Sequence, residues 1–360
     1  MRRRVLLGTA VAVIALVATS CSGGQQAWTM QTVPRGIGML NDVVCPSTTL
    51  CYAVGRYGKA GPGVIIGSSD GGHRWKVLLT TTEAPLSAIA CPTADTCVVG
   101  GDKLLSSTDI PATFVSTDDG AHWSSETLPK GIFGVDGAAC ASVKVCLVTG
   151  SVGIDRTTNG GTTWIMEKMP SRFFLMGPVA CPTRSFCIVG GTGGSSSSLA
   201  SVSKDAGATW SSAVVAAGPV YSKEDSFAST ALGALSCSSA QHCVGLVGDG
   251  SLSSFGAGSP IVTSDAGRTW TRGSSGVGWV DSCVGNFCAS VGGHLGPLAG
   301  RAFVTTGNAF TSTDGGVNWR PSSIPTRLIP TAVSCTSSTH CVAVGGNLPK
   351  AKSAMIMTYS

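Results

Sequence analysis

The sequence predicts an all-β protein built as a ring of seven four-stranded antiparallel sheets, and three observations support this prediction. Glycine makes up 49 of the 360 residues and aromatic residues only 6%, which suits short strands and tight turns better than long helices. Fourteen cysteines fall into seven close pairs. The pairs recur at a period of about 48 residues, the length of one four-stranded blade. We therefore expect a seven-bladed β-propeller.

The cysteine pairs predict seven disulfides, one in each unit. Every unit has an apolar run, a first cysteine, a polar turn, a second cysteine and a run ending in glycine, which fits two adjacent strands clamped across their turn. Each short loop should add roughly 2 kcal/mol to the free energy of unfolding. Zinc binding is the alternative, but the Cys-x-x-Cys spacing of zinc sites is missing, so we expect no metal. The predicted pairs are Cys45–Cys51, Cys91–Cys97, Cys140–Cys146, Cys181–Cys187, Cys237–Cys243, Cys283–Cys288 and Cys335–Cys341.

The N-terminus predicts export from the cell. Arginines at positions 2 to 4 precede an apolar stretch from Val5 to Val17, which is short for a membrane span, and small residues precede Cys21. The segment Ala18–Cys21 resembles the bacterial lipobox, and this resemblance implies cleavage before Cys21 and attachment of a lipid to its sulfur. An ordinary cleaved secretory signal is the alternative.

Three segments follow from this interpretation. We expect residues 1–20 to be the lipoprotein signal peptide, residues 21–26 a lipid-anchored tether, and residues 27–360 the propeller. The paired cysteines fit an oxidising compartment. We therefore expect the protein at the extracytoplasmic face of the cell membrane, held there by its lipid.

A second motif, Ser/Thr-x-Asp-x-Gly-x-x-Trp, recurs six times. Its aspartate can accept hydrogen bonds from turn amides, its glycine permits a positive φ, and its tryptophan can pack on a neighbouring sheet. The third copy carries asparagine, which keeps the acceptor and loses the charge. The acceptor residues are Asp70, Asp118, Asn159, Asp205, Asp265 and Asp314.

These six copies resemble the Asp-box, or BNR, repeat of sialidase-type propellers, and the resemblance spans nearly the whole mature chain. It implies the propeller fold and says little about activity. The carboxylates have two interpretations, as turn acceptors or as catalytic acids and calcium ligands. We favour the first, because a repeated architecture requires the same turn chemistry in every unit.

The two ends of the chain share one unit. Residues 355–360 match residues 64–69, up to the point where a further Asp-box would begin, and residues 27–34 match residues 163–170, which follow an Asp-box. We therefore predict that residues 27–34 form the outer strand of a blade whose other strands come from residues 330–360. Such closure removes the open edges of the ring.

Four basic residues recur where one blade connects to the next: Arg35, Lys130, Arg172 and Arg327. These connections and those between the second and third strands share one face of a propeller, and binding residues concentrate on such variable loops. We expect the second-to-third connections to be irregular, with a long one from Gly292 to Ala309. A ring of cations there favours an anionic partner, such as an acidic sugar, a carboxylate or an acidic protein patch. The alternative is that these side chains are merely solvated.

Overall charge does not point to nucleic acid. Without the signal peptide, 21 basic residues face 19 acidic ones, a net charge of +2. The sequence also lacks a phosphate-binding glycine loop and a His-Glu-x-x-His helix, so we expect no cofactor.

The resemblance to sialidases raises the question of catalysis. Those enzymes use an arginine triad, a Tyr/Glu nucleophile pair and an acidic proton donor, and the best candidates here are Tyr221, Glu224 and Asp225. The sialidase Arg-Ile-Pro motif is absent. The chain also resembles the propellers of photosystem II assembly factors and sortilin-type receptors, which implies protein scaffolding. We therefore expect a monomeric, non-catalytic binding or assembly module for a glycan or a membrane protein. A sialidase-type glycoside hydrolase and a carbohydrate-binding lectin are the alternatives.

Overall fold

The computed structural model describes most of the chain beyond the N-terminal segment. The described residues are 26–81, 85–101, 112–129, 131–132, 134–150, 153–170, 172–193, 197–217, 232–247, 259–274, 278–298, 301–347 and 353–360. The predicted signal peptide and Cys21 lie outside them. Within these ranges there is no helix long and apolar enough to cross a membrane.

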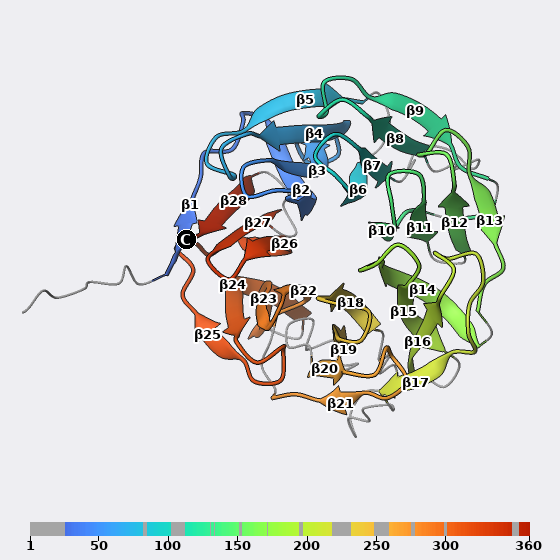
Figure 1. The fold of residues 1–360 in the computed structure, drawn as a ribbon. Helices are drawn as coiled ribbons and strands as arrows, with labels where there is room; N and C mark the ends of the chain where they lie inside the picture. Colours follow the sequence, from blue (N-terminus) through green and yellow to red (C-terminus); the bar gives the residue numbers. More distant parts are fainter. Residues whose placement is uncertain are drawn as a thin grey trace, which may run out of the picture.

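Seven antiparallel blades of four strands surround a central axis, with the first strand of each blade innermost and the last outermost (Figure 1). Five blades are separate sheets, and blades 1 and 7 join in one eight-stranded sheet through the Met39–Gly346 pair. Blade 1 contains β2 (Ile37–Val44), β3 (Cys51–Tyr57), β4 (Gly63–Ser68) and β5 (Lys76–Thr80). Blade 2 contains β6 (Leu86–Ala90), β7 (Cys97–Gly101), β8 (Ala112–Ser116) and β9 (Ser124–Thr127). Blade 3 contains β10 (Gly137–Cys140), β11 (Cys146–Gly150), β12 (Gly153–Thr157) and β13 (Ile165–Glu167). Blade 4 contains β14 (Phe173–Ala180), β15 (Cys187–Gly193), β16 (Ser198–Ser203) and β17 (Val214–Ala217).

The remaining blades follow the same order. Blade 5 contains β18 (Leu232–Cys237), β19 (Cys243–Val247), β20 (Ser259–Thr263) and β21 (Thr271–Arg272). Blade 6 contains β22 (Val280–Val284), β23 (Phe287–Leu298), β24 (Arg301–Ser312) and β25 (Arg320–Ser322). Blade 7 contains β26 (Ile329–Ser337), β27 (His340–Gly346), β28 (Ala354–Tyr359) and, from the other end of the chain, β1 (Trp28–Met30). The predicted seven-bladed architecture is confirmed.

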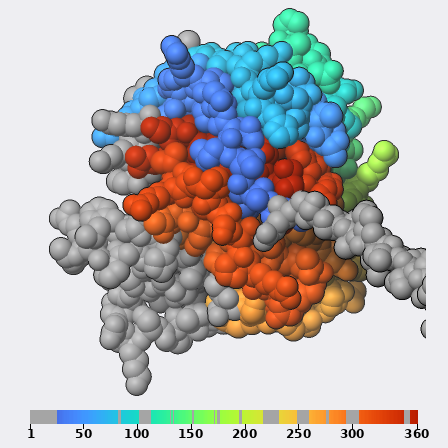
Figure 2. Space-filling view, turned by 90° about the vertical axis from the view of Figure 1, so that its left-hand side faces the viewer, coloured from blue at the N-terminus to red at the C-terminus, as the bar shows by residue number. Residues whose placement is uncertain are grey.

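Blade 7 closes the ring with both ends of the chain. Strand β1 pairs antiparallel with β28, placing Trp28 opposite Tyr359 and Met30 opposite Met357. The Trp28 side chain is buried, and its ring lies 5.2 Å from that of Tyr359. Figure 2 shows the N-terminal segment, in blue, lying against the C-terminal strands, in red. The predicted closure is confirmed.

The outer strand of blade 7 is shorter than expected. The prediction of a strand over residues 27–34 was too long, because β1 covers only Trp28–Met30. One further backbone bond follows, from the Gln31 amide to the Ile356 carbonyl at 2.9 Å. Pro34 has no amide hydrogen and cannot continue the ladder.

The connection expected at residues 292–309 is a strand pair instead. Strands β23 and β24 pair from Gly292–Asn308 to Leu298–Arg301, with one register shift between His294 and Leu295. The glycines and Pro297 predicted an irregular loop, and that prediction was wrong. Cross-strand pairing overrides local preference here, since β24 contributes a run rich in β-branched and aromatic residues.

The hydrophobic core lies between the blades. Between blades 7 and 1, for example, Val43 packs in one buried cluster with Val342 and Val344. Side-chain hydrogen bonds near the axis also link neighbouring blades, such as Asn41 Nδ2 to the Leu86 carbonyl at 2.7 Å. Each blade is therefore stabilised by its neighbours, and the ring positions both of its faces rigidly.

Candidate binding surfaces

Every blade has two ends with different roles. The first and third links within a blade, after its first and third strands, form what we call the turn end. The second link and the link to the next blade form the connection end. The cysteine pairs lie at the turn end, and the predicted cationic residues lie at the connection end.

Seven disulfides fasten the first turn of every blade. The predicted pairs are all bonded, with Cα–Cα distances of 3.9–4.1 Å. In blade 3, for instance, Cys140 and Cys146 are directly opposite each other in the strand register. Directly opposed residues in the narrow pairs of an antiparallel ladder come close enough for this bond.

The second turn of the turn end, which we call the Asp turn, has the same hydrogen bonds in six blades. In blade 5 the Thr263 hydroxyl donates to Asp265 Oδ1 at 2.8 Å and accepts the Gly267 amide at 3.0 Å. Asp265 Oδ1 also accepts the Thr269 amide at 2.9 Å. Gly267 has φ +80°, a conformation that favours glycine. The same carboxylate or amide oxygen accepts the amide four residues ahead in the other five blades, at Asp70, Asp118, Asn159, Asp205 and Asp314.

In each of these six blades, one backbone hydrogen bond joins the two turns. In blade 1 the Gly71 amide donates to the Thr49 carbonyl at 2.7 Å. Equivalent bonds run from Asp119 to Asp95, Gly160 to Lys144, Ala206 to Ser185, Ala266 to Gln241 and Gly315 to Asn286, at 2.8–3.3 Å. The disulfide turn and the Asp turn therefore form one hydrogen-bonded unit.

The lowered pKa values of the turn aspartates indicate that these carboxylates stay ionised. Bonds from the Thr269 side chain and amide lower the pKa of Asp265 to about 2. The His122 amide and ring lower the pKa of Asp118 to about 2. The Asn318 amide lowers the pKa of Asp314. A carboxyl group with a lowered pKa is a poor proton donor, which supports the structural interpretation of these residues.

Three other aspartates, one buried and two half-buried, lie in the strands of the blades. Asp42 of β2 accepts the amides of Val43 and Ile89, both at 2.8 Å, yet burial raises its pKa to about 6. Burial alone raises the pKa of Asp155 in β12 to about 7. Burial also raises the pKa of Asp281 in β22 to about 8. Among the described residues, neither oxygen of Asp155 has a hydrogen-bond partner.

The predicted cations occupy the connection end but do not form one cluster. Arg35 links blade 7 to blade 1 and Arg327 links blade 6 to blade 7, whereas Arg172 links blade 3 to blade 4 on the other side of the ring (Figure 1). All three side chains are exposed. Arg172 has φ +81° and donates to the Ala213 carbonyl at 3.4 Å. In the described part of the chain, none of the three forms an ion pair.

Several predicted residues cannot be placed. Lys130 and the candidate catalytic residues Tyr221, Glu224 and Asp225 lie outside the described residues, as does Cys21. In the ranges that the structure describes, no group of three or more His, Cys, Asp or Glu side chains is arranged to hold a metal ion.

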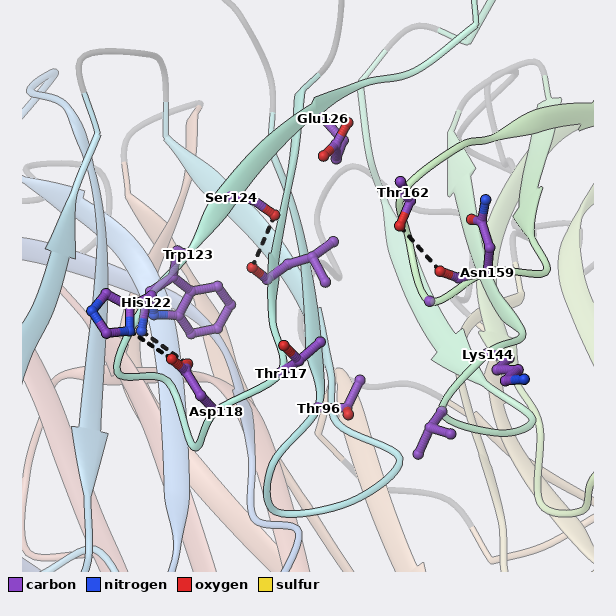
Figure 3. Close-up of a pocket in the computed structure, with 13 residues that line it drawn as sticks. Thr96, Thr117, Asp118, His122, Trp123, Ser124, Glu126, Lys144, Asn159 and Thr162 are labelled. Atoms are coloured by element: carbon purple, nitrogen blue, oxygen red, sulfur yellow. Dashed lines mark hydrogen bonds and ion pairs between the residues drawn. The ribbon is translucent and has the colours of Figure 1, made fainter.

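The structure contains a cavity that sequence reasoning missed. It has a volume of about 560 Å³ and lies at the turn end, between blades 2 and 3 (Figure 3). Blade 2 contributes Asp118, His122, Trp123 and Glu126 to its wall, and blade 3 contributes Lys144, Asn159, Gly160 and Thr162. His122 Nδ1 lies 2.6 Å from Asp118 Oδ2, whereas the Glu126 and Lys144 side chains make no hydrogen bond or ion pair with any described residue.

Comparisons with known proteins show the fold. No protein-family model matches this sequence, and no curated protein matches it. A structure of YCF48 bound to a D1 peptide is similar, with a TM-score of 0.59 and 13% identity over 92% of this chain and 97% of that one. A GH74 xyloglucanase from Xanthomonas campestris has a TM-score of 0.58 and 16% identity over 92% of this chain and 55% of that one. The WD40 β-propeller domain of Doa1 has a TM-score of 0.60 and 12% identity over 93% of this chain and 96% of that one. This chain is therefore a β-propeller.

Proposed function

We propose that this protein is an exported, lipid-anchored propeller that binds a partner through its connection end and does not catalyse a reaction. One observation carries the proposal: the polar groups of the Asp turns are used within the fold, whereas the connection end presents exposed arginines without carboxylate partners among the described residues. Variable loops on a rigid frame are where binding specificity generally lies.

The partner we propose is anionic. Arg35, Arg172 and Arg327 present guanidinium groups, which bind carboxylates through paired hydrogen bonds. Their spread around the ring fits an extended ligand, such as an acidic polymer or the acidic face of a protein, better than a single small anion. The YCF48 structure with its bound D1 peptide supports peptide binding as a use of this fold, although at 13% identity it identifies no ligand here.

The engagement of the turn aspartates and of Glu167 favours binding over glycoside hydrolysis. The five turn aspartates accept turn hydrogen bonds, and Glu167 is paired with Arg156 at 3.3 Å. A hydrolase of the sialidase type would instead need a free pair of acidic groups beside its nucleophile.

The direct test measures binding of polyglutamate and of sialylated oligosaccharides to the intact protein. We expect the triple substitution of Arg35, Arg172 and Arg327 by Ser to weaken binding at least tenfold. The matched control replaces three exposed bases at the turn end, Arg74, Lys204 and Arg268, by Ser and changes the net charge equally. Equal affinity of the two triple variants would refute the proposed face.

The anchor has its own test. We expect incorporation of radiolabelled palmitate in the producing cells and loss of this label in the Cys21→Ser variant. An unlabelled wild-type protein that leaves the cell freely would refute the lipid anchor and leave the binding face untouched.

A further inference from the structure

The cavity between blades 2 and 3 corresponds to a place that an arginine fills between blades 3 and 4. The two junctions are related by the repeat. In β8, Val115 lies opposite Ser124, and in β12, Arg156 lies opposite Ile165, the first residue of the last strand in each case. Each of the two also directly precedes the hydroxyl residue that begins its Asp turn. Val115 and Arg156 therefore occupy equivalent positions.

Between blades 3 and 4, the Arg156 guanidinium bridges two blades. Its Nε donates to the Ala206 carbonyl in the Asp turn of blade 4, at 2.9 Å. Its Nη1 donates to Glu167 Oε1 in β13, at 3.3 Å. Both charged side chains are nearly buried, at 14% and 13% exposure. The guanidinium thus fills this junction with directional bonds to a carbonyl and a carboxylate.

Between blades 2 and 3, the same two acceptors are present without an arginine. Glu126 stands three residues after Trp123, as Glu167 stands three residues after Trp164. Gly160 holds the Asp-turn position that Ala206 holds in blade 4. Both Glu126 and Gly160 line the cavity, and Val115 replaces the arginine. The half-buried Glu126 carboxylate has no hydrogen bond or ion pair with any residue that the structure describes.

The junction between blades 1 and 2 shows a third solution, in which an apolar side chain closes the gap. Leu78 takes the position of Glu126 and packs against Gly67 and Gly120. A Cβ added to Gly67 would lie 2.7 Å from Leu78 Cδ1, and one added to Gly120 would lie 3.2 Å from it. Of these three junctions, only the one between blades 2 and 3 keeps the carboxylate and lacks the group that neutralises it.

We infer that this cavity binds the guanidinium group of an arginine side chain, presented by a peptide or by free arginine. The site lies at the turn end and does not depend on the anionic partner proposed for the connection end. Charge favours a cation, because the Glu126 carboxylate lines the cavity without a partner among the described residues, while Asp118 beside it is bonded to His122. The half-buried Trp123 offers a ring on which a planar cation can stack.

Geometry favours arginine over lysine. The internal example uses two donors that point in different directions, to a carbonyl and to a carboxylate, and a guanidinium presents such donors in a fixed fork. Lys144 is exposed on the opposite wall, where its ammonium group can donate to the backbone carbonyl or carboxylate of the ligand. Lys144 distinguishes a peptide from free arginine. Only free arginine carries a carboxylate beside its own α-ammonium group.

The test titrates the intact protein with acetyl-Gly-Arg-Gly-amide, with free arginine, and with matched peptides carrying lysine or citrulline. Calorimetry and Trp123 fluorescence report binding. We expect saturable binding of an arginine probe, at least tenfold weaker binding of the lysine peptide, and no binding of the citrulline peptide. Tighter binding of the peptide identifies a protein partner, and tighter binding of free arginine identifies the amino acid. No saturable binding of either probe, or equal binding of the citrulline peptide, would overturn the inference.

Three substitutions locate the site. Glu126→Gln should weaken binding at least tenfold, and Glu126→Leu, which copies the closed junction of blade 1, should abolish it. Val115→Arg supplies the arginine internally and should block the site while leaving the near-UV circular dichroism spectrum native. Glu167→Gln breaks the occupied junction and should leave the affinity unchanged. Wild-type affinity in a folded Glu126→Gln protein would remove the site from this cavity.

Discussion

Aspartates at the turn end and aspartates between the blades experience opposite environments in the same molecule. Asp265 and Asp314 lie at the surface and accept several hydrogen bonds from their own turns, so their pKa values are lowered. Asp155 is fully buried without a partner among the described residues, so its pKa rises to about 7. The comparison shows that turn donors keep an exposed aspartate ionised, whereas burial raises the pKa of an aspartate inside the ring, even for Asp42 with its two amide donors.

The two groups give opposite dependences of stability on pH. The turn aspartates stabilise the fold above their unfolded pKa near 3.8, and this contribution is lost as the pH falls toward about 2. Asp155 keeps its proton in the folded state, so its effect is absent below pH 3.8 and destabilises the fold progressively as the pH rises to about 7. Asp42 and Asp281, whose pKa values burial also raises, act in the same direction as Asp155. We therefore expect maximal stability in the mildly acidic range.

The largest effect should come from Asp155. Replacing it by Asn removes the titrating group. Between pH 4 and pH 8.5 the free energy of unfolding of the wild type should therefore fall by up to about 4 kcal/mol relative to that of Asp155→Asn. Urea denaturation across this range measures the difference. The exposed Asp95→Asn variant is the control and should track the wild type. Parallel curves for the wild type and Asp155→Asn would show that the buried carboxyl group is not protonated.

The second-largest effect on stability should come from removing a disulfide at the turn end. Replacing Cys140 and Cys146 together by Ala should lower the free energy of unfolding by about 2 kcal/mol, because the loop that they close is free in the unfolded chain. The loss should be equal at pH 4 and pH 8, unlike that of the buried aspartate. A loss that varies with pH would indicate that the disulfide turn and the titrating groups are coupled.

A single Asp turn should contribute less. Asp314→Ala removes an acceptor that binds the Asn318 amide and the Ser312 hydroxyl, and the cost should be about 1 kcal/mol because solvent screens this exposed site. Asp314→Asn should cost less, since blade 3 uses Asn159 at the same position. The penalty of the Ala variant should shrink as the pH falls below 3.8, because protonation removes the charge that strengthens these bonds. Thermal unfolding at pH 2 and pH 6 provides the measurement, and an equal penalty at both values would contradict the role of the charge.

The smallest effect concerns backbone conformation in the same turns. Ala266 has φ +61°, where blade 6 has Gly315 at φ +72°. Ala266→Gly should raise the free energy of unfolding by roughly 0.5–1 kcal/mol, because glycine adopts positive φ without steric cost. The reverse substitution, Gly315→Ala, should destabilise, since its Cβ would lie 2.6 Å from His242 Nε2. Equal melting temperatures for the two variants would show that φ at this position has no energetic weight.

The repeat made the fold predictable from the sequence. Cysteine spacing fixed the number of blades, and the match between the two chain ends located the closing blade at Trp28 and Tyr359. Local residue types were a poorer guide to strand lengths. The glycines after Gly292 favour a loop on their own, and their strand depends on a partner in β24 that only the folded hairpin supplies.

The cavity was not predictable in the same way. Its signal is present in the sequence as a difference between repeats, Val115 where the next blade has Arg156, with a glutamate retained in both. That difference becomes meaningful only when the strand register shows that both side chains belong to the same kind of junction. A site made by two blades depends on tertiary placement, which no local pattern contains.

The pairing of β1 with β28 in blade 7 also constrains when this molecule can fold. Thr29 and Thr358 hydrogen-bond at 3.0 Å although they lie 329 positions apart in the chain. The first strand must therefore wait, without its partner, until synthesis has reached the last few residues. A chain without β28 (Ala354–Tyr359) exposes both β1 and the edge of β27, so closure of the ring depends on these six residues.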